Sequence, residues 1–169
     1  YFKISTAGVK EGDFTFIYGF PGYTQEYIHS EGVRYISEIS DPSKVALRTL
    51  RLNIMNRHMS KSQAVRIQYS MKKAIVANAW KKWQGEAGGI KKRKTVQINQ
   101  DYEKRFIQWA KGTEYDGIVE HIDSLYKELE TPHFIVDVFS ETAQTIEIAR
   151  LARQVSGHSL ETVKNISKS

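Results

Sequence analysis

The sequence predicts a mainly α-helical protein: a bundle of about five or six helices, with a short β segment at the N-terminus. From about residue 41 onward, apolar residues recur at the spacing of helix faces. Only residues 12–22 show the alternation that is typical of a strand. The chain has 169 residues, of which 40% are hydrophobic and 26% are charged, so it can bury one core as a folded domain.

The expected strand is bounded by turn residues, Gly12-Asp13 before it and the Gly-Phe-Pro-Gly sequence of residues 19–22 after it. Between them, Phe14, Phe16 and Tyr18 fall on one face. A lone strand cannot satisfy its own backbone hydrogen bonds, and within this chain only residues 1–4 could pair with it. We therefore expect that part of a sheet lies outside this sequence.

The first long helix is expected to begin at Asp41, as an N-cap, with Pro42 at the first helical position. A capping box over residues 60–63 predicts the start of the second, which should end between Gly85 and Gly89. A lysine-rich loop should follow. Pro132 is expected to end a later helix. The apolar stripes on which these expectations rest are Leu47, Leu50 and Ile54; Ala64, Ile67, Met71, Ala74 and Ile75; Ile98, Tyr102, Phe106 and Trp109; Ile118, Ile122, Leu125 and Leu129; Phe139, Ala143, Ile146, Ala149 and Ala152; and Leu160, Val163 and Ile166.

The net charge of +6 is unevenly distributed. Residues 41–112 hold 17 Lys and Arg against 4 Asp and Glu, whereas residues 113–169 hold 5 against 10. Such a basic segment could bind nucleic acid, could dock on an acidic helical layer, or could be a solvated face. The basic residues are spread along whole helices, which favours the last two interpretations.

Several classes of chemistry have no residues to support them. The sequence has no cysteine, and it lacks the motifs of a nucleophile elbow, a zinc-binding helix or a phosphate-binding loop. The Glu-x-x-His spacing occurs at Glu26/His29 and at Glu130/His133, but the first lies in a loop-like stretch and Pro132 interrupts the second. We expect no metal site, no cofactor and no membrane-spanning segment.

Asn78 is the most informative polar residue. It follows Ile75 by three positions and Met71 by seven, which places it on the apolar face of its helix. A buried amide there would need hydrogen-bond partners, whereas an amide that faces a pocket could accept a hydrogen bond from a ligand ammonium group. Trp80 and Trp83 fall on a neighbouring face, where core packing is the expected role.

The strand sequence of residues 12–22 resembles strands of chymotrypsin-like serine peptidase barrels. Together with the Asn-Ala-Trp-Lys-Lys-Trp sequence of residues 78–83, it resembles one family, the bacterial dipeptidyl-peptidase 7/11 group of serine exopeptidases. The similarity runs along most of the chain. The family usually has a larger aromatic residue where this chain has Ala79.

The resemblance implies that residues 1–23 end a β-barrel strand of a peptidase domain. Residues 24–169 would form the first part of an inserted helical cap domain. The family's Ser-His-Asp triad has no counterpart here, so no catalytic residue is assigned and the segment by itself should be inactive. One substrate-binding residue carries over: Asn78 would hold the free amino terminus of a peptide.

The expected function is thus that of a cap segment in a secreted or periplasmic serine dipeptidyl aminopeptidase. Its partner would be a peptide with a free N-terminus, with a homodimer possible and neither nucleic acid nor a membrane involved. The alternatives are a free-standing basic helical module that binds nucleic acid or a protein, and a helical bundle without a ligand.

Overall fold

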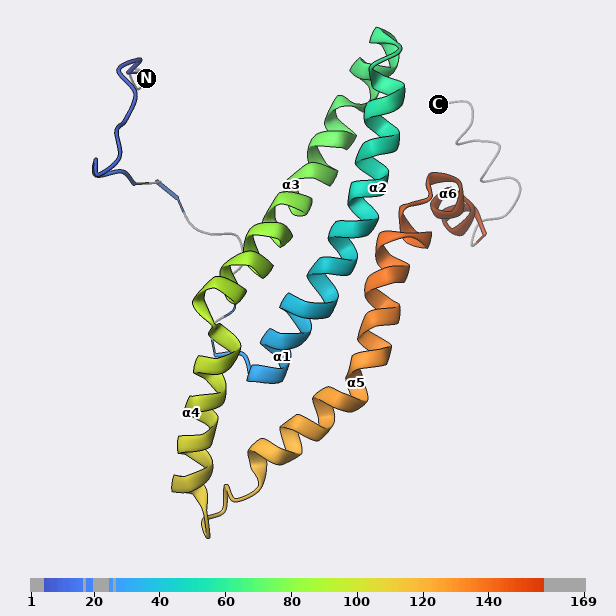
Figure 1. Ribbon diagram of the computed structural model, residues 1–169. Helices are drawn as coiled ribbons and strands as arrows, with labels where there is room; N and C mark the ends of the chain where they lie inside the picture. The colour runs from blue at the N-terminus through green and yellow to red at the C-terminus, as the bar shows by residue number, and fades with distance from the viewer. Residues whose placement is uncertain (1–4, 17, 20–24, 26, 157–169) are drawn as a thin grey trace.

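The computed structural model describes residues 5–16, 18, 19, 25 and 27–156. The helices of this part of the chain confirm the mainly α prediction (Figure 1). In chain order the elements are α1 (Ser30–Tyr35), the π-helical turn η1 (Ile36–Ser40), α2 (Asp41–Met59), α3 (Gln63–Arg93), α4 (Thr95–Ala110), α5 (Ile118–Glu141), the 3-10 turn η2 (Ala143–Thr145) and α6 (Glu147–Val155).

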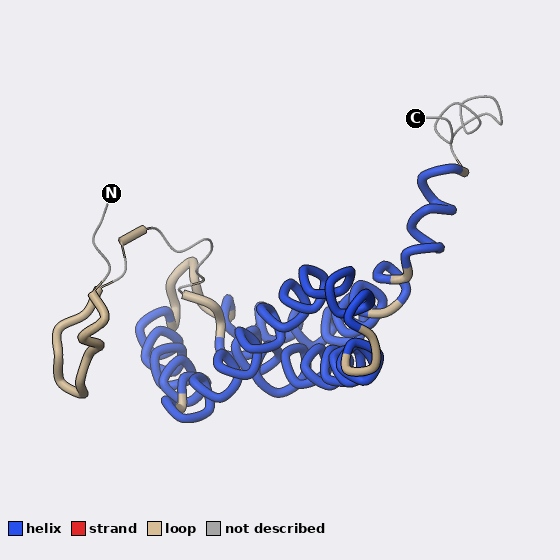
Figure 2. The backbone as a smooth tube through the Cα atoms, turned by 90° about the horizontal axis from the view of Figure 1, so that it is seen from above, coloured by secondary structure: helices blue, strands red, loops and turns tan. Residues whose placement is uncertain are grey.

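The long helices form an elongated layer in which α2 lies between α3 and α5 (Figure 1). α4 continues from the end of α3, and α5 returns beside α1 and α2. The described residues between 5 and 19 stand apart from the helices, as Figure 2 shows from above. The arrangement leaves one face of α3 without a neighbouring helix within the part that the structure describes.

α2 begins at Asp41 with Pro42 in its first turn, close to the expected start, but its N-cap is Ser40 and not Asp41. α1, η1 and α2 follow one another without a loop, and the backbone N–H of Asp41 bonds to the carbonyl of Ile36, five residues earlier. Pro42 lacks an N–H, and its ring would collide with a carbonyl in a regular helix. The wider π turn just before Pro42 lets the helix pass through it.

α3 begins within the expected stretch of residues 60–63, with Ser62 as its N-cap where the capping box predicted Ser60, and it ends later than expected. Ser62 is its N-cap, since the side-chain oxygen accepts a hydrogen bond from the backbone N–H of Val65. The helix continues past Gly85 and Gly89, and the lysine-rich stretch forms its last turn instead of a loop. Glycine weakens a helix by only about 1 kcal/mol per residue, which the rest of a 31-residue helix can offset.

α5 also runs through the residue that was expected to end it. Pro132 lies inside α5, and the helix is bent along its length in Figure 1. The next expected stripe, from Phe139 to Ala152, is divided among the end of α5, η2 and α6. Leu160, Val163 and Ile166 lie outside the described residues.

The expected strand is not formed in the described residues. Residues 13–16 and 18 belong to no helix or strand, and Phe14, Phe16 and Tyr18 are 74–97% exposed. Ile17 and residues 20–22 lie outside the description, as do residues 1–4, the candidate pairing partner. A strand without a partner has no ladder to hold it, which explains the difference from the expectation.

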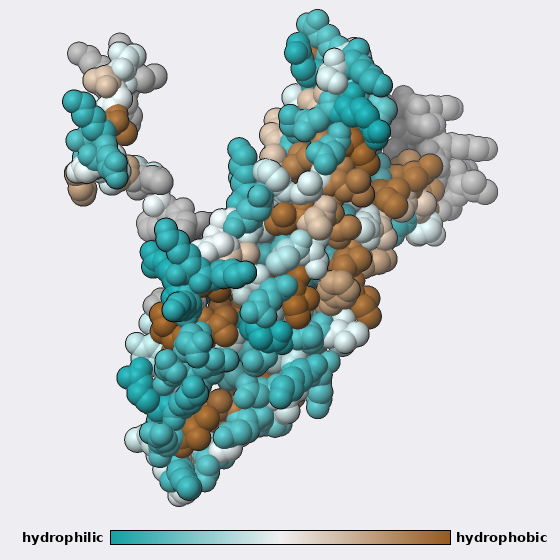
Figure 3. Space-filling model, viewed as in Figure 1, coloured by the Kyte–Doolittle hydropathy of each residue, from teal (hydrophilic) through white to brown (hydrophobic). Residues whose placement is uncertain are grey.

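The bundle has a small buried core and large exposed apolar surfaces. The buried hydrophobic residues of the described part are Val33, Leu52, Val76, Ala110 and Val119. Apolar side chains of α3, α5 and α6 remain exposed, and Figure 3 shows brown surface interspersed with teal along the visible face. Exposed apolar area of this extent is typical of a surface that another polypeptide covers.

One residue separates α3 from α4. Lys94 has φ 54° and ψ 40°, the left-handed conformation that is unfavourable for residues other than glycine. We expect Lys94→Gly to raise the free energy of unfolding by about 0.5–1 kcal/mol, because glycine adopts this conformation without steric cost. Denaturant unfolding measures the change. Arg93→Gly, in the adjacent helical position, is the control and should lower stability by about 1 kcal/mol; equal losses for both variants would contradict the argument.

Candidate functional site

The face of α3 that carries Asn78 is exposed. Met71 and Ile75 share this face and are 71% and 64% exposed, and Asn78 is exposed as well. The Asn78 side chain forms no hydrogen bond or ion pair with the described residues. The sequence analysis placed the amide on an apolar face correctly, but within this chain that face is turned to solvent.

The opposite face of α3 is fixed to α2. The indole N–H of Trp80 donates a 2.8 Å hydrogen bond to the hydroxyl of Thr49. The ring of Trp83 lies under the guanidinium of Arg48, 4.4 Å from its centre, and under the ammonium of Lys44 at 5.0 Å. Both tryptophans thus pack against α2, as expected. Because Trp80 is two residues from Asn78, this packing also sets the direction in which the amide points.

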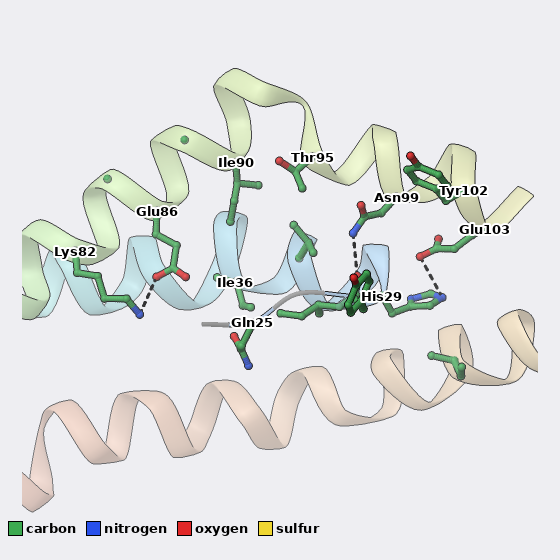
Figure 4. A pocket seen from close by; sticks show the side chains of 16 residues that line it. Gln25, His29, Ile36, Lys82, Glu86, Ile90, Thr95, Asn99, Tyr102 and Glu103 are labelled. Carbon is green, nitrogen blue, oxygen red and sulfur yellow. Dashed lines mark hydrogen bonds and ion pairs between the residues drawn. The ribbon is translucent and has the colours of Figure 1, made fainter. Parts of the chain in front are cut away.

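A pocket of about 1160 Å³ lies further along the Asn78 face, between α1, α3 and α4 (Figure 4). Lys82, Gly85 and Gly89 follow Asn78 at helical spacing, so the exposed stripe leads directly into the pocket. A Cβ added at Gly85 or Gly89 would meet nothing within 4 Å. Lys82 and Glu86 form an ion pair of 3.2 Å at the pocket wall.

The far end of the pocket contains a polar cluster that the sequence did not reveal. Glu103 of α4 accepts hydrogen bonds from the backbone N–H of Ser30 at 2.7 Å and from its hydroxyl at 2.5 Å. His29 Nδ1 accepts from the backbone N–H of Glu31, while Nε2 lies 3.6 Å from Glu103 and 3.7 Å from Asp123. The cluster joins α1 to α4 and α5. No local spacing in the sequence relates His29 to Glu103 or Asp123, which are more than 70 residues away.

These residues do not amount to a metal centre. Among the described residues, no group of three or more His, Cys, Asp or Glu side chains is arranged to hold a metal ion. Glu26, the other half of the first Glu-x-x-His pair, lies outside the description. In the described part of the chain, no helix has the length and apolarity needed to cross a bilayer.

Asp41 is a buried acid beside the pocket wall. It is 2% exposed, and its Oδ2 atom has no hydrogen-bond partner among the described residues. Burial, and after it the negative charge of Glu86, raises the pKa of the Asp41 carboxyl from its ordinary 3.8 to about 6. The folded protein therefore keeps a proton on Asp41 that the unfolded chain releases. The stability that this proton contributes is complete below pH 3.8 and is lost as the pH rises through 6.

We expect Asp41→Asn to raise the free energy of unfolding at pH 8 by about 1–2 kcal/mol, since the amide removes a buried charge. Near pH 4 the same substitution should change stability little, because Asp41 is already neutral in the folded state. Denaturant unfolding at both pH values measures the difference. Asp101→Asn, at an exposed position of α4, is the control. A gain of equal size at pH 4 and pH 8 would contradict the role of the buried charge.

Comparison with known proteins identifies the relatives of this helical chain. The Peptidase S46 family model matches residues 1–168. The chain is 40% identical over 145 residues to an Asp/Glu-specific dipeptidyl-peptidase of Capnocytophaga gingivalis, covering 83% of this chain and 20% of that protein. It is 27% identical over 186 residues to a dipeptidyl-peptidase 7 of Phocaeicola vulgatus, covering 96% of this chain and 25% of the relative. The chain thus spans a fifth to a quarter of the length of these relatives, and it belongs to the peptidase S46 family.

Proposed function

We propose that this chain is the helical cap segment of a serine dipeptidyl aminopeptidase, an enzyme that removes dipeptides from the N-termini of peptides. Residues 1–23 would complete a barrel of the peptidase domain, and residues 24–169 would begin the helical domain inserted after it. Relatives named dipeptidyl-peptidases and the short span of the match support this assignment. The exposed apolar faces of α3 and α5 support it too, because an inserted domain needs surfaces that dock on other parts of the protein.

In this proposal the cap segment sets how far the N-terminus of a peptide can enter the active site. An enzyme that releases dipeptides must stop the peptide two residues from the bond that is cut. The carbonyl oxygen of Asn78 would accept a hydrogen bond from the terminal ammonium group and so fix that distance. The single observation that carries the idea is the exposed amide on a helix whose opposite side is fixed by Trp80 and Trp83. A rigid support of this kind is what precise positioning requires.

The reaction itself would take place on the peptidase domain. A serine would attack the scissile carbonyl, a histidine would act as base and then as acid, an aspartate would orient the histidine, and backbone N–H groups would stabilise the oxyanion. The whole enzyme would act in the periplasm or outside the cell on peptides with a free N-terminus. A homodimer would cover part of the apolar surface.

The first test compares the longer protein with the isolated chain on dipeptidyl chromogenic amides. The longer protein should cleave substrates with a free N-terminus, should leave their N-acetylated forms intact, and should be inactivated by a serine-directed inhibitor. The isolated chain should show no turnover. Turnover by the isolated chain that the inhibitor abolishes would contradict the assignment, as would equal cleavage of free and acetylated substrates.

A further inference from the structure

We propose that Lys94 is a one-residue conformational switch, whose change from the left-handed to the right-handed helical conformation would join α3 and α4 into one straight helix. α3 ends at Arg93 and α4 begins at Thr95, so Lys94 is the whole connection. Its carbonyl already accepts the first hydrogen bond of α4, from the N–H of Ile98 at 3.0 Å. A change of φ and ψ at Lys94 alone is therefore enough to make the helix continuous.

Two features of the bent state favour straightening. The left-handed conformation of Lys94 disfavours the bent form by a factor of about ten in population. In addition, no side chain caps the N-terminus of α4, so the N–H groups of its first turn lack the partners that a continuous helix would supply. Gly85, Gly88 and Gly89 lie in the last three turns of α3, and a Cβ at any of them would meet no atom within 4 Å. These glycines make the C-terminal turns of α3, which lead to Lys94, easier to bend.

Contacts between α4 and the start of α1 hold the bend. Glu103 accepts the two hydrogen bonds from Ser30. The side-chain amide of Asn99, labelled in Figure 4, donates a 2.8 Å hydrogen bond to the carbonyl of Ile28. The three basic residues of the last turn of α3 also favour a helix end at this point, because they interact well with its dipole. The backbone strain at Lys94 thus favours the straight form, and a small set of tertiary hydrogen bonds favours the bent form.

The switch would change the pocket, because α4 forms one of its walls. Thr95, Asn99 and Tyr102 line the pocket from α4, opposite Val33 and Ile36 of α1 and η1. Straightening would carry this wall away from α1 and open the pocket. A molecule that fills the pocket in the bent form would shift the balance toward that form.

Distance measurements between paired spin labels test this proposal directly, since the chain has no native cysteine to interfere. The labels are placed at Glu38→Cys and Gln108→Cys, two exposed positions on η1 and α4. In the unaltered background, the short distance of the bent form should dominate. The double substitution Asn99→Ala and Glu103→Ala removes the hydrogen bonds that join α4 to the start of α1, and we call it the tether-free variant. It should shift the distribution toward a distance longer by on the order of 10 Å.

Adding Lys94→Gly to the tether-free variant is the decisive step. Because glycine adopts the left-handed conformation freely, it should restore the short distance and raise the ratio of bent to straight forms by about tenfold. General loosening or unfolding of α4 would not respond to this substitution. A label pair at Leu50→Cys and Gln68→Cys, on α2 and α3, should keep one distance in all variants. Gln97→Ala, at an exposed position of α4, is the matched control for the α4 substitutions and should leave the short distance in place.

The proposal fails if the tether-free variant keeps the short distance, or if Lys94→Gly does not restore it. Circular dichroism on each variant shows whether the helices remain folded. If they do not, the single substitution Glu103→Gln provides a milder release, and an unchanged distance distribution there would also overturn the switch. These readouts are independent of peptidase activity, so their failure would leave the proposed function untouched.

Discussion

Replacing Asn78 by alanine in the longer protein is expected to lower kcat/KM for dipeptidyl amides with a free N-terminus by about 10- to 100-fold. A hydrogen bond to a charged group contributes about 1.5–3 kcal/mol, and each 1.4 kcal/mol corresponds to a factor of ten. The loss should appear in kcat/KM because, in the proposed role, the amide would hold the substrate in the register that the transition state requires. Steady-state kinetics on one free-amine series measures the effect.

The control for this experiment is Asn53→Ala, which removes another exposed amide, from α2. It should leave kcat/KM unchanged. Asn78→Asp offers a second comparison, because a carboxylate can still accept a hydrogen bond from the ammonium group and should retain more activity than alanine. An unchanged kcat/KM for Asn78→Ala would remove the residue from the substrate-binding site and leave the family membership as it stands.

Replacing Glu141 by alanine is expected to lower the free energy of unfolding by about 3–4 kcal/mol. Glu141 receives two hydrogen bonds from the Arg48 guanidinium, at 2.7 and 2.8 Å, and both side chains are at least 85% buried. Arg48 also donates to the carbonyl of Val76 at 3.1 Å and covers the ring of Trp83. Removal of the carboxylate would leave a buried cation without its main partner at the junction of α2, α3 and α5.

Urea unfolding monitored by circular dichroism measures this loss. Glu147→Ala is the matched control, because Glu147 pairs with Lys72 at an exposed position between α6 and α3. Its removal should change stability far less, since exposed ion pairs contribute little. Equal midpoints for the two variants would show that the buried pair is not the connection between helices that its geometry suggests.

The sequence predicted the features that depend on local periodicity. The stripe Ile98, Tyr102, Phe106 and Trp109 predicted α4, and the capping box over residues 60–63 predicted the start of α3 to within about two residues. The position of Asn78 on a face shared with Met71 and Ile75 also followed from spacing alone. Periodicity is a property of the backbone itself, so it can be read without knowing what the helix touches.

The incorrect expectations share a cause. Pro132 and the glycines of α3 are read as helix ends when only local preference is considered. In the structure α3 and α5 continue through these residues, because the many other residues of each long helix offset the local cost. The expected strand shows the reverse case, because good local propensity produced no strand in the described residues.

By itself, the sequence determined that this protein is mainly helical, where several helices begin, and which face of α3 presents the Asn78 amide. Only the tertiary structure decided that α2 lies between α3 and α5, that Arg48 and Glu141 meet, and that Glu103 joins Ser30 across 73 residues. The reason is physical: a helix face follows from a repeat of 3.6 residues along the chain. The partner of a buried charge follows from contacts between distant segments, which no local pattern encodes.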